Sequence, residues 1–193
     1  MFVLDQRYRG YLSEINQNKP LADSLRIAFA VKGDLTSTLW DYQTKIDSLN
    51  LSRAEEIIKQ YGYPGKSVVG TPTNEAIFYV IQHSPKIESY FSVIQKAAQA
   101  NQMPFHLAAM MEDRRLTGQM KPQIYGTQVG CYPLKNNFSK QECFVWPVKD
   151  PNGVNKRRVK AGFTQSIEDN AKRLGVQYKP LTMEEAKNRY TLF

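Results

Sequence analysis

Apolar residues recur at helical spacing along most of the chain, and Gly and Pro residues divide these runs into short segments. The clearest run places five apolar residues on one helical face: Leu35, Leu39, Tyr42, Ile46 and Leu49. This spacing is typical of an amphipathic α-helix that buries one side. The sequence therefore predicts a mainly helical protein.

Capping residues, Gly and Pro set the expected helix ends. Two capping boxes begin at Ser52 and Thr182, Gly62 follows one helix as a stop, and Pro85 interrupts another by removing an amide donor. The predicted helices cover residues 5–16, 21–31, 35–49, 52–61, 73–84, 86–100, 104–115, 166–174 and 183–190.

Two segments rich in β-branched and aromatic residues, 123–132 and 143–148, are separated by a polar stretch and favour an antiparallel hairpin. The predicted fold class is mainly α (α+β): a helical, bundle-like single domain over residues 1–193 with a hairpin insertion around 123–148. At 193 residues the chain suits one domain.

A hairpin centred near Asn137 places Cys131 opposite Cys143 and Gln128 opposite Trp146. A cross-strand disulfide is then geometrically feasible. Two reduced cysteines are nevertheless the preferred prediction, because the residues given carry no secretion signal. With only two cysteines and two histidines and no metal-ligand spacing, no metal and no cofactor are expected.

The balance of 26 Lys and Arg against 18 Asp and Glu gives a net charge of +8, which favours anionic partners. An anionic small-molecule ligand fits this charge. Nucleic acid is a weaker expectation, because no nucleic-acid-binding motif accompanies it. No apolar stretch is long enough for a membrane helix and no signal peptide is recognisable, so a soluble, cytoplasmic protein without a membrane partner is expected.

Two polar side chains extend apolar helical stripes. His83 follows Ala76 and Val80 at helical spacing, and Arg114 lies seven residues after Leu107. Both side chains are therefore expected to face the interior or a cleft. Histidine on an apolar face is more often a core residue than a catalytic one, and Arg114 can instead reach water or pair with a distant carboxylate.

The segment Gln123 to Gln128 is expected to alternate between two faces of a strand, with Gly126 interrupting it. A glycine there often marks a bulge or a close approach by a ligand or by backbone, although ordinary packing explains it equally well. Farther along the chain, Lys156, Arg157, Arg158 and Lys160 form the only compact basic run, which is more typical of a solvated face than of an anion site.

These residues resemble an uncharacterised family of bacterial domains of unknown function. The shared pattern is an early DQxxR, a GWP-like turn, a QH pair, a DR pair, QxYGTQ and a late basic pair. It appears here as Asp5-Gln6 with Arg9, Gly62-Tyr63-Pro64, Gln82-His83, Asp113-Arg114, Gln123 to Gln128, and Arg157-Arg158. Tyr63 replaces the tryptophan of the turn, and residues 132–142 look like a locally extended hairpin loop. The resemblance implies a shared site but names no chemistry.

Three functions compete. The first is a metal-independent acid–base enzyme acting on an anionic, for example phosphorylated, substrate. Its predicted catalytic residues are His83, Asp113, which would orient it, and Arg114. Its predicted ligand-binding residues are Asp5, Gln6, Gln82, Gln123, Tyr125, Gly126, Thr127, Gln128, Arg157 and Arg158. The alternatives are a noncatalytic module that binds an anionic ligand or a protein, and a buried polar network without a ligand.

Overall fold

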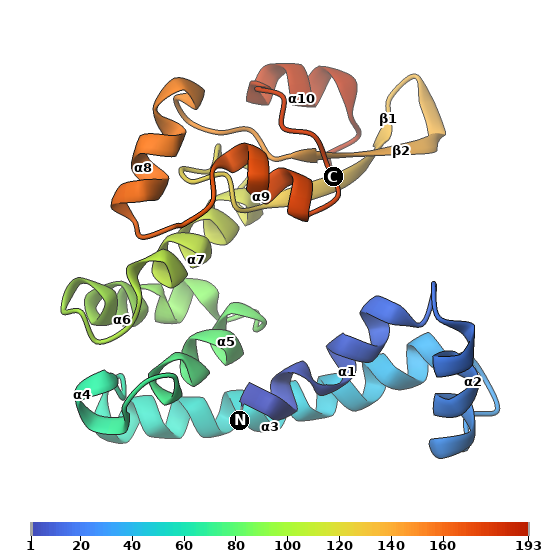
Figure 1. Ribbon diagram of the computed structural model, residues 1–193, viewed down its shortest axis with the longest axis vertical. Helices are drawn as coiled ribbons and strands as arrows, with labels where there is room; N and C mark the ends of the chain where they lie inside the picture. The colour runs from blue at the N-terminus through green and yellow to red at the C-terminus, as the bar shows by residue number, and fades with distance from the viewer. Residues whose placement is uncertain (1, 193) are drawn as a thin grey trace. The chain divides into compact units, whose positions relative to one another are not determined.

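The computed structural model describes residues 2–192, with side chains from residue 5 onward. Over this range the protein is mainly helical with one two-stranded antiparallel sheet, which confirms the predicted fold class (Figure 1). The chain forms two compact units, Met1–Val93 and Ile94–Phe193, and their boundary falls inside α6 (Ile87–Gln99). The single domain stays a prediction.

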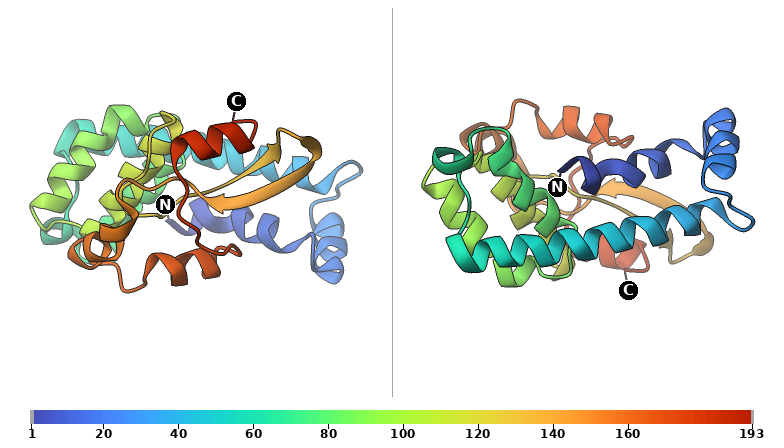
Figure 2. Two further views of the ribbon diagram at one scale, coloured as in Figure 1. Left: turned by 90° about the horizontal axis from the view of Figure 1, so that it is seen from above. Right: turned by 90° about the horizontal axis from the view of Figure 1, so that it is seen from below.

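The first unit consists of α1 (Phe2–Glu14), α2 (Lys19–Ala28), α3 (Leu35–Tyr61), α4 (Lys66–Val69), the 3-10 helix η1 (Thr73–Glu75) and α5 (Ala76–Gln82). Helix α1 lies along α3 (Figures 1 and 2), and α5 packs against both. The apolar faces of α1, α2 and α3 bury a core that includes Tyr8, Ile15, Leu25, Leu35 and Leu39. The packing of α5 against α1 and α3 brings the polar residues of α1 and α5 together.

Helix α3 is continuous over 27 residues, so the helix boundary predicted at the Ser52 capping box is wrong. The buried face of α3 runs past this position, from Leu35 and Leu39 to Asn50 and Ala54. Burying one continuous face against neighbouring helices stabilises a helix more than a local cap signal ends it. The helix ends at Tyr61, and Gly62 follows with a positive φ of 72°, as its sequence predicts.

The second unit contains α7 (Phe105–Gly118), β1 (Val129–Leu134), β2 (Asn137–Val145), the 3-10 helix η2 (Pro151–Gly153), α8 (Val154–Lys160), α9 (Ile167–Arg173) and α10 (Met183–Arg189). The capping box at Thr182 is confirmed at the start of α10. Helix α8 is not among the predicted helices, because its basic run gives no apolar stripe. Its two inward residues are Val154 and Arg158.

The register of the hairpin matches the prediction. Cys131 lies opposite Cys143, and the Trp146 amide donates to the Gln128 carbonyl at 3.0 Å. The predicted first strand is wrong in extent, however, because β1 begins at Val129 and residues 124–128 form a loop. The pairing also shifts by a bulge between Pro133 and Leu134, so the turn is short rather than an extended loop.

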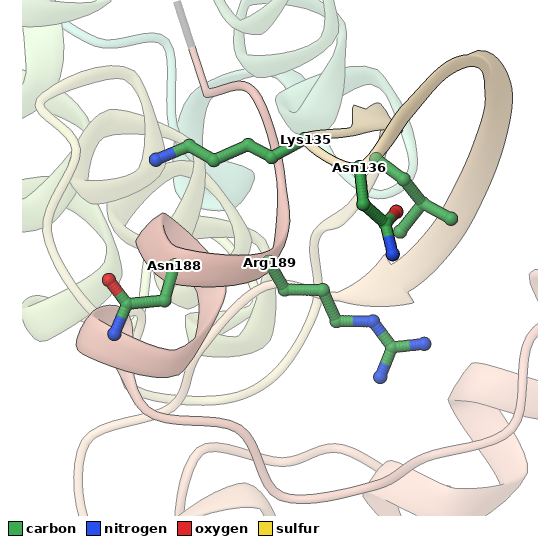
Figure 3. Close-up of a pocket in the computed structure, with 5 residues that line it drawn as sticks. Lys135, Asn136, Asn188 and Arg189 are labelled. Carbon is green, nitrogen blue, oxygen red and sulfur yellow. The ribbon is translucent and has the colours of Figure 1, made fainter.

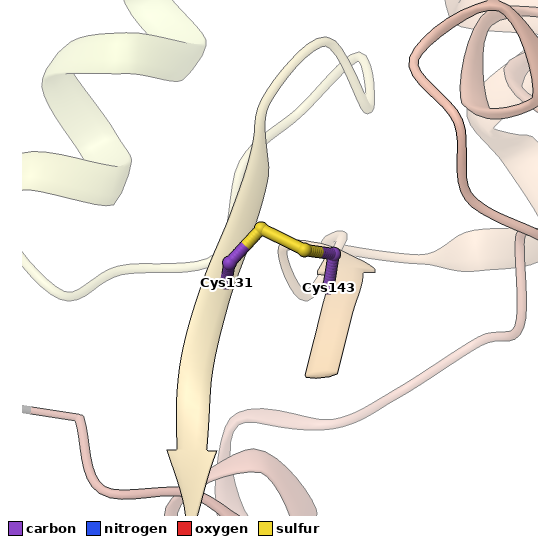
Figure 4. The surroundings of a disulfide bond; sticks show 2 residues. All are labelled: Cys131 and Cys143. Carbon is purple, nitrogen blue, oxygen red and sulfur yellow. A yellow bond between two sulfur atoms is a disulfide. The ribbon is translucent and has the colours of Figure 1, made fainter. Parts of the chain in front are cut away.

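Cys131 and Cys143 form a disulfide between the two strands, so the expectation of two reduced cysteines is wrong (Figure 4). Their Cα atoms lie 4.0 Å apart, because the register makes the cysteines direct cross-strand neighbours. The backbone amide of Trp146 donates to the Gln128 carbonyl, so Gln128 and Trp146 form a hydrogen-bonded pair. Hydrogen-bonded and non-hydrogen-bonded pairs alternate along an antiparallel ladder, which makes Cys131 and Cys143 a closely spaced, non-hydrogen-bonded pair.

Helix α3 is longer than a bilayer requires, yet its sequence is too polar for that environment. No helix within residues 2–192 combines the length and apolar character needed to cross a membrane.

Candidate functional site

Asp5 and His83 form a carboxylate–imidazole pair in the first unit. Asp5 lies on α1, and His83 is the C-terminal cap of α5. The His83 Nδ1 atom is 3.0 Å from Asp5 Oδ2 and 3.3 Å from Oδ1. The Asp5 side chain is 1% exposed, whereas the His83 side chain is 18% exposed, so a buried carboxylate orients an imidazole that reaches the surface.

Two glutamine side chains position Asp5, one through its carboxylate and one through its backbone carbonyl. Gln6 Nε2 donates to Asp5 Oδ2 at 2.5 Å. Gln43, fully buried on α3, donates to the Asp5 carbonyl at 2.9 Å and accepts from the Tyr8 amide at 3.2 Å. The Gln43 side chain of α3 thus hydrogen-bonds two backbone groups of α1, and it fixes the position of Asp5 along α3.

The second ring nitrogen of His83, Nε2, has no hydrogen-bond partner among residues 5–192. A carboxylate accepts only, so neutral His83 facing Asp5 carries its proton on Nδ1 and leaves the Nε2 lone pair free. This is the arrangement in which a histidine acts as a base. Gln82, the neighbour of His83, is buried.

Asp113 organises the loop that precedes β1 in the second unit. Its carboxylate is fully buried and accepts hydrogen bonds from the amides of Ile124, Tyr125 and Thr127 and from the Thr127 hydroxyl, at 2.7 to 3.2 Å. Burial raises the pKa of the Asp113 carboxyl, and these hydrogen bonds oppose that shift. These donors explain why the segment is a loop: its amides bind a side chain instead of a neighbouring strand.

Gln123 holds the two ends of the same loop together. Its side chain donates to the carbonyls of Gln128 and Trp146 at 3.0 and 2.6 Å and accepts from the Gln128 amide at 2.9 Å. Gln128 in turn donates to the Thr127 hydroxyl at 3.0 Å. The side chains of Gln123 and Gln128 thus form hydrogen bonds inside the second unit.

Both arginines of α8 also bind this loop. Arg157 donates to the Ile124 carbonyl at 3.1 Å, and Arg158 donates to the Tyr125 carbonyl at 2.7 Å. Arg158 is buried, 2% exposed, and stacks over the Phe163 ring. Burial lowers the pKa of its guanidinium, and the charge of Asp113 opposes this shift. The basic pair is therefore engaged in packing rather than fully solvated.

Gly126 is closely approached, as its sequence suggested, and the group that approaches it is the side chain of Ile167. Its φ is +70°, and a Cβ atom added there would lie 2.1 Å from Ile167 Cδ1. The Asn170 side chain donates to the Gly126 carbonyl at 3.2 Å. The glycine is required for packing against α9 whether or not a ligand binds nearby.

The predicted site residues divide between the two units. Asp5, Gln6, Gln82 and His83 lie in the first, and their carboxylate–imidazole contact is made by Asp5, not by Asp113. The remaining residues lie in the second unit, where Arg114 is half-buried and Thr117 donates to its carbonyl at 2.9 Å. A single site formed by both groups stays a prediction.

Sequence reasoning overlooked Glu112. It is half-buried on α7 and makes no hydrogen bond or ion pair to any side chain described between residues 5 and 192. Burial raises the pKa of its carboxyl, as does the nearby Asp113 charge, while Arg115 lowers it. Burial and the charge of Glu112 also raise the pKa of the Tyr125 phenol. No sequence motif marks Glu112, because Tyr125, with which it interacts, lies in the loop before β1.

A small basic pocket of about 290 Å³ lies between the hairpin turn and α10 and is lined in part by Lys135, Asn136, Asn188 and Arg189 (Figure 3). The two cations extend in different directions, and Arg189 pairs with Glu142 at 2.6 Å. Such divergent, exposed charges do not form an anion cradle. Over the side chains described, no cluster of three His, Cys, Asp or Glu residues could hold a metal ion.

The fold and these contacts define a mainly helical protein with a hairpin-bearing unit and a surface-reaching Asp–His pair. Residues 22–179 match the family of unknown function DUF6624, which covers most of the chain, and the protein belongs to this family. The expected resemblance to an uncharacterised family is therefore confirmed. No curated protein and no solved structure matches the chain.

Proposed function

We propose that this protein is an acid–base enzyme that acts on an anionic substrate, with His83 as the proton-transferring group and Asp5 as the residue that orients it. The carrying observation is the 3.0 Å contact between His83 Nδ1 and buried Asp5, which leaves Nε2 without a partner among residues 5–192. Asp5 thus takes the orienting role that the sequence analysis gave to Asp113.

The chemistry follows from the two ring nitrogens. Nε2 would accept a proton from water or from a substrate hydroxyl as the new bond forms, and it would return that proton to the leaving group. Asp5 stabilises the imidazolium formed between these steps and keeps the ring in the correct tautomer. Substrate charge is inferred from the net charge of +8, which attracts anions over distance.

Turnover of a panel of phosphate monoesters, phosphate diesters, nucleotides and charged glycans tests the proposal. We expect His83→Gln to remove any turnover found while the unfolding temperature stays near that of the unmodified protein. His106→Gln, which changes the only other histidine of the sequence, is the matched control and should retain turnover. Turnover that survives His83→Gln would refute the assignment.

For the loop of residues 123–128 we propose a structural role, the third of the expected alternatives. The hydrogen bonds that Asp113 accepts from four donor groups and the packing of Arg158 support it, because buried polar groups that are fully engaged rigidify a fold. Noncatalytic binding of an anion or a protein is the remaining alternative. Anion binding without turnover, lost on His83→Gln, would favour it.

The disulfide bears on where the protein works. Disulfides persist mainly in oxidising compartments, so the Cys131–Cys143 bond favours such a compartment over the cytoplasm expected from sequence. Fractionation of the native cells, with thiols blocked before lysis, tests this. Recovery of reduced protein from the cytoplasmic fraction would support the original expectation.

A further inference from the structure

An apolar groove opens on the first unit between the end of α3, α4 and the start of α5. Its volume is about 390 Å³, within the range of about 300 to 1,000 Å³ typical of small-molecule sites. Nine residues line it: Ile57, Tyr61, Tyr63, Pro64, Val68, Val69, Thr73, Ala76 and Ile77. Two of them, Tyr63 and Pro64, belong to the GYP turn, for which the proposed catalysis gives no role.

The groove gathers side chains that ordinarily avoid water. Val68 is 77% exposed, Tyr61 is 71% exposed and Val69 is 38% exposed. Single exposed apolar residues are common, but several around one hollow mark a binding surface. Leaving these side chains in water costs free energy that an occupant would recover.

The walls of the groove are held in place by the chain itself. The Tyr63 hydroxyl donates to the Asn74 carbonyl, which ties the turn after α3 to the segment before α5. Burial raises the pKa of the Tyr63 phenol, which keeps it protonated as a donor. A preformed groove binds more tightly than one that must be ordered on binding, because less conformational entropy is lost.

The lining also specifies the charge of the occupant. None of the nine residues is charged, so the groove offers no counterion to an acid or an amine. The hydroxyls of Tyr61 and Thr73 make no hydrogen bond to another described residue, which leaves two uncharged polar groups for recognition. We propose that this groove binds an uncharged, mainly apolar small molecule that carries a hydroxyl or carbonyl group.

This binding site is separate from the proposed catalytic pair. Ala76 begins α5 and His83 caps its end, which places them roughly 10 Å apart along the helix axis at 1.5 Å per residue. The inference therefore does not depend on His83 chemistry. Loss of one activity should leave the other unchanged.

Two matched fluorescent probes test the proposal on the whole protein. N-phenyl-1-naphthylamine is uncharged, and its 8-sulfonate analogue is an anion of similar shape. We expect the uncharged probe to bind with one-to-one saturation and about tenfold more tightly than the anion, although the net charge of +8 favours the anion elsewhere. Equal or tighter binding of the anion would overturn the proposal.

Variants locate the binding. Val68→Asp places a charge at the groove, and Ala76→Trp fills it; each should weaken binding of the uncharged probe at least about tenfold. Ile27→Asp is the control, because Ile27 is an equally exposed aliphatic residue on α2, 83% exposed. If the proposal is right, Ile27→Asp should bind the uncharged probe as tightly as the unmodified protein does. Unchanged probe binding by Val68→Asp would contradict it.

Light scattering tests whether a second copy of the protein, rather than a small molecule, covers the groove. We expect the same molecular mass for the unmodified protein and for Val68→Asp. A dimer that dissociates in Val68→Asp, together with absence of saturable probe binding, would show that a second copy covers the groove and would overturn the small-molecule assignment.

Discussion

His83 takes its orientation from a carboxylate 78 residues earlier in the chain. Its own surroundings on α5 would make it an ordinary residue at the end of an apolar stripe. What distinguishes it is the combination of a buried acceptor at Nδ1 and an available Nε2. At the scale of single residues, therefore, the proposed function depends on one contact between α1 and α5.

Gly126 shows how tightly a single residue can constrain the second unit. We expect Gly126→Ala to lower the free energy of unfolding by roughly 2 kcal/mol or more, because it adds a Cβ at positive φ and a clash with Ile167. Gly162→Ala has a similar φ, +86°, but open space around it, and should cost only about 1 kcal/mol. Equal losses in urea unfolding would show that Ile167 simply moves aside.

Glu112 predicts a pH dependence of stability. Burial raises the pKa of its carboxyl above the ordinary value of 4.5, so the folded state binds this proton more tightly than the unfolded state. That contribution is present below pH 4.5 and is lost as the pH rises through the raised value. Glu112→Gln stays neutral throughout, so we expect it to be more stable than the unmodified protein at neutral pH.

Thermal unfolding from pH 3.5 to pH 8 compares Glu112→Gln with the unmodified protein, and the advantage of Glu112→Gln should shrink as the pH falls. An advantage of Glu112→Gln that grows toward acid pH would reverse the sign and contradict the argument.

At the scale of elements, Asp113 connects α7 to the loop before β1. We expect Asp113→Ala to cost roughly 3 kcal/mol of unfolding free energy, because it leaves three partly buried amides without an acceptor. Asp113→Asn keeps one acceptor oxygen and should lose less. Asp23→Ala, an exposed carboxylate on α2, is the control. Chemical denaturation that finds Asp113→Ala as stable as Asp23→Ala would remove the structural role.

The hairpin carries a separate stabilising link. The disulfide closes a loop of 12 residues, and removing it should lower the free energy of unfolding by about 3 kcal/mol through the entropy of the unfolded chain. A double Cys131→Ser and Cys143→Ser variant measures this loss. The unmodified protein in reductant should unfold at the same denaturant concentration as the variant. A reductant that has no effect would mean that the cysteines are not bonded.

Local signals predicted the helices well because caps and apolar spacing act within a few residues. Thr182 begins α10 and Gly62 follows α3, as their neighbours in sequence require. The Ser52 capping box failed because tertiary burial of α3 outweighs a local cap. The side chains of residues 124–128 favour a strand, but the segment forms a loop because its amides donate to Asp113, which lies on another element.

At the scale of the whole molecule, the candidate site was only partly predictable. Spacing identified His83 as inward-facing, but not that its partner is Asp5 rather than Asp113. Such pairings join distant segments and leave no trace in periodicity. The apolar groove was likewise not predictable, because its nine residues come from α3, α4, η1 and α5 and from the turn after α3. Each compact unit carries its own polar cluster, and only the cluster of the first unit presents an imidazole nitrogen without a described partner.

The most direct test of the central claim is the protonation pattern of the His83 ring, measured by long-range ¹H–¹⁵N correlation NMR at a pH where the imidazole is neutral. We predict a proton on Nδ1 and none on Nε2 in the unmodified protein. Asp5→Ala should shift the population toward the Nε2-protonated tautomer, while Asp23→Ala should leave it unchanged. An Nε2-protonated ring in the unmodified protein would contradict the proposed acid–base pair.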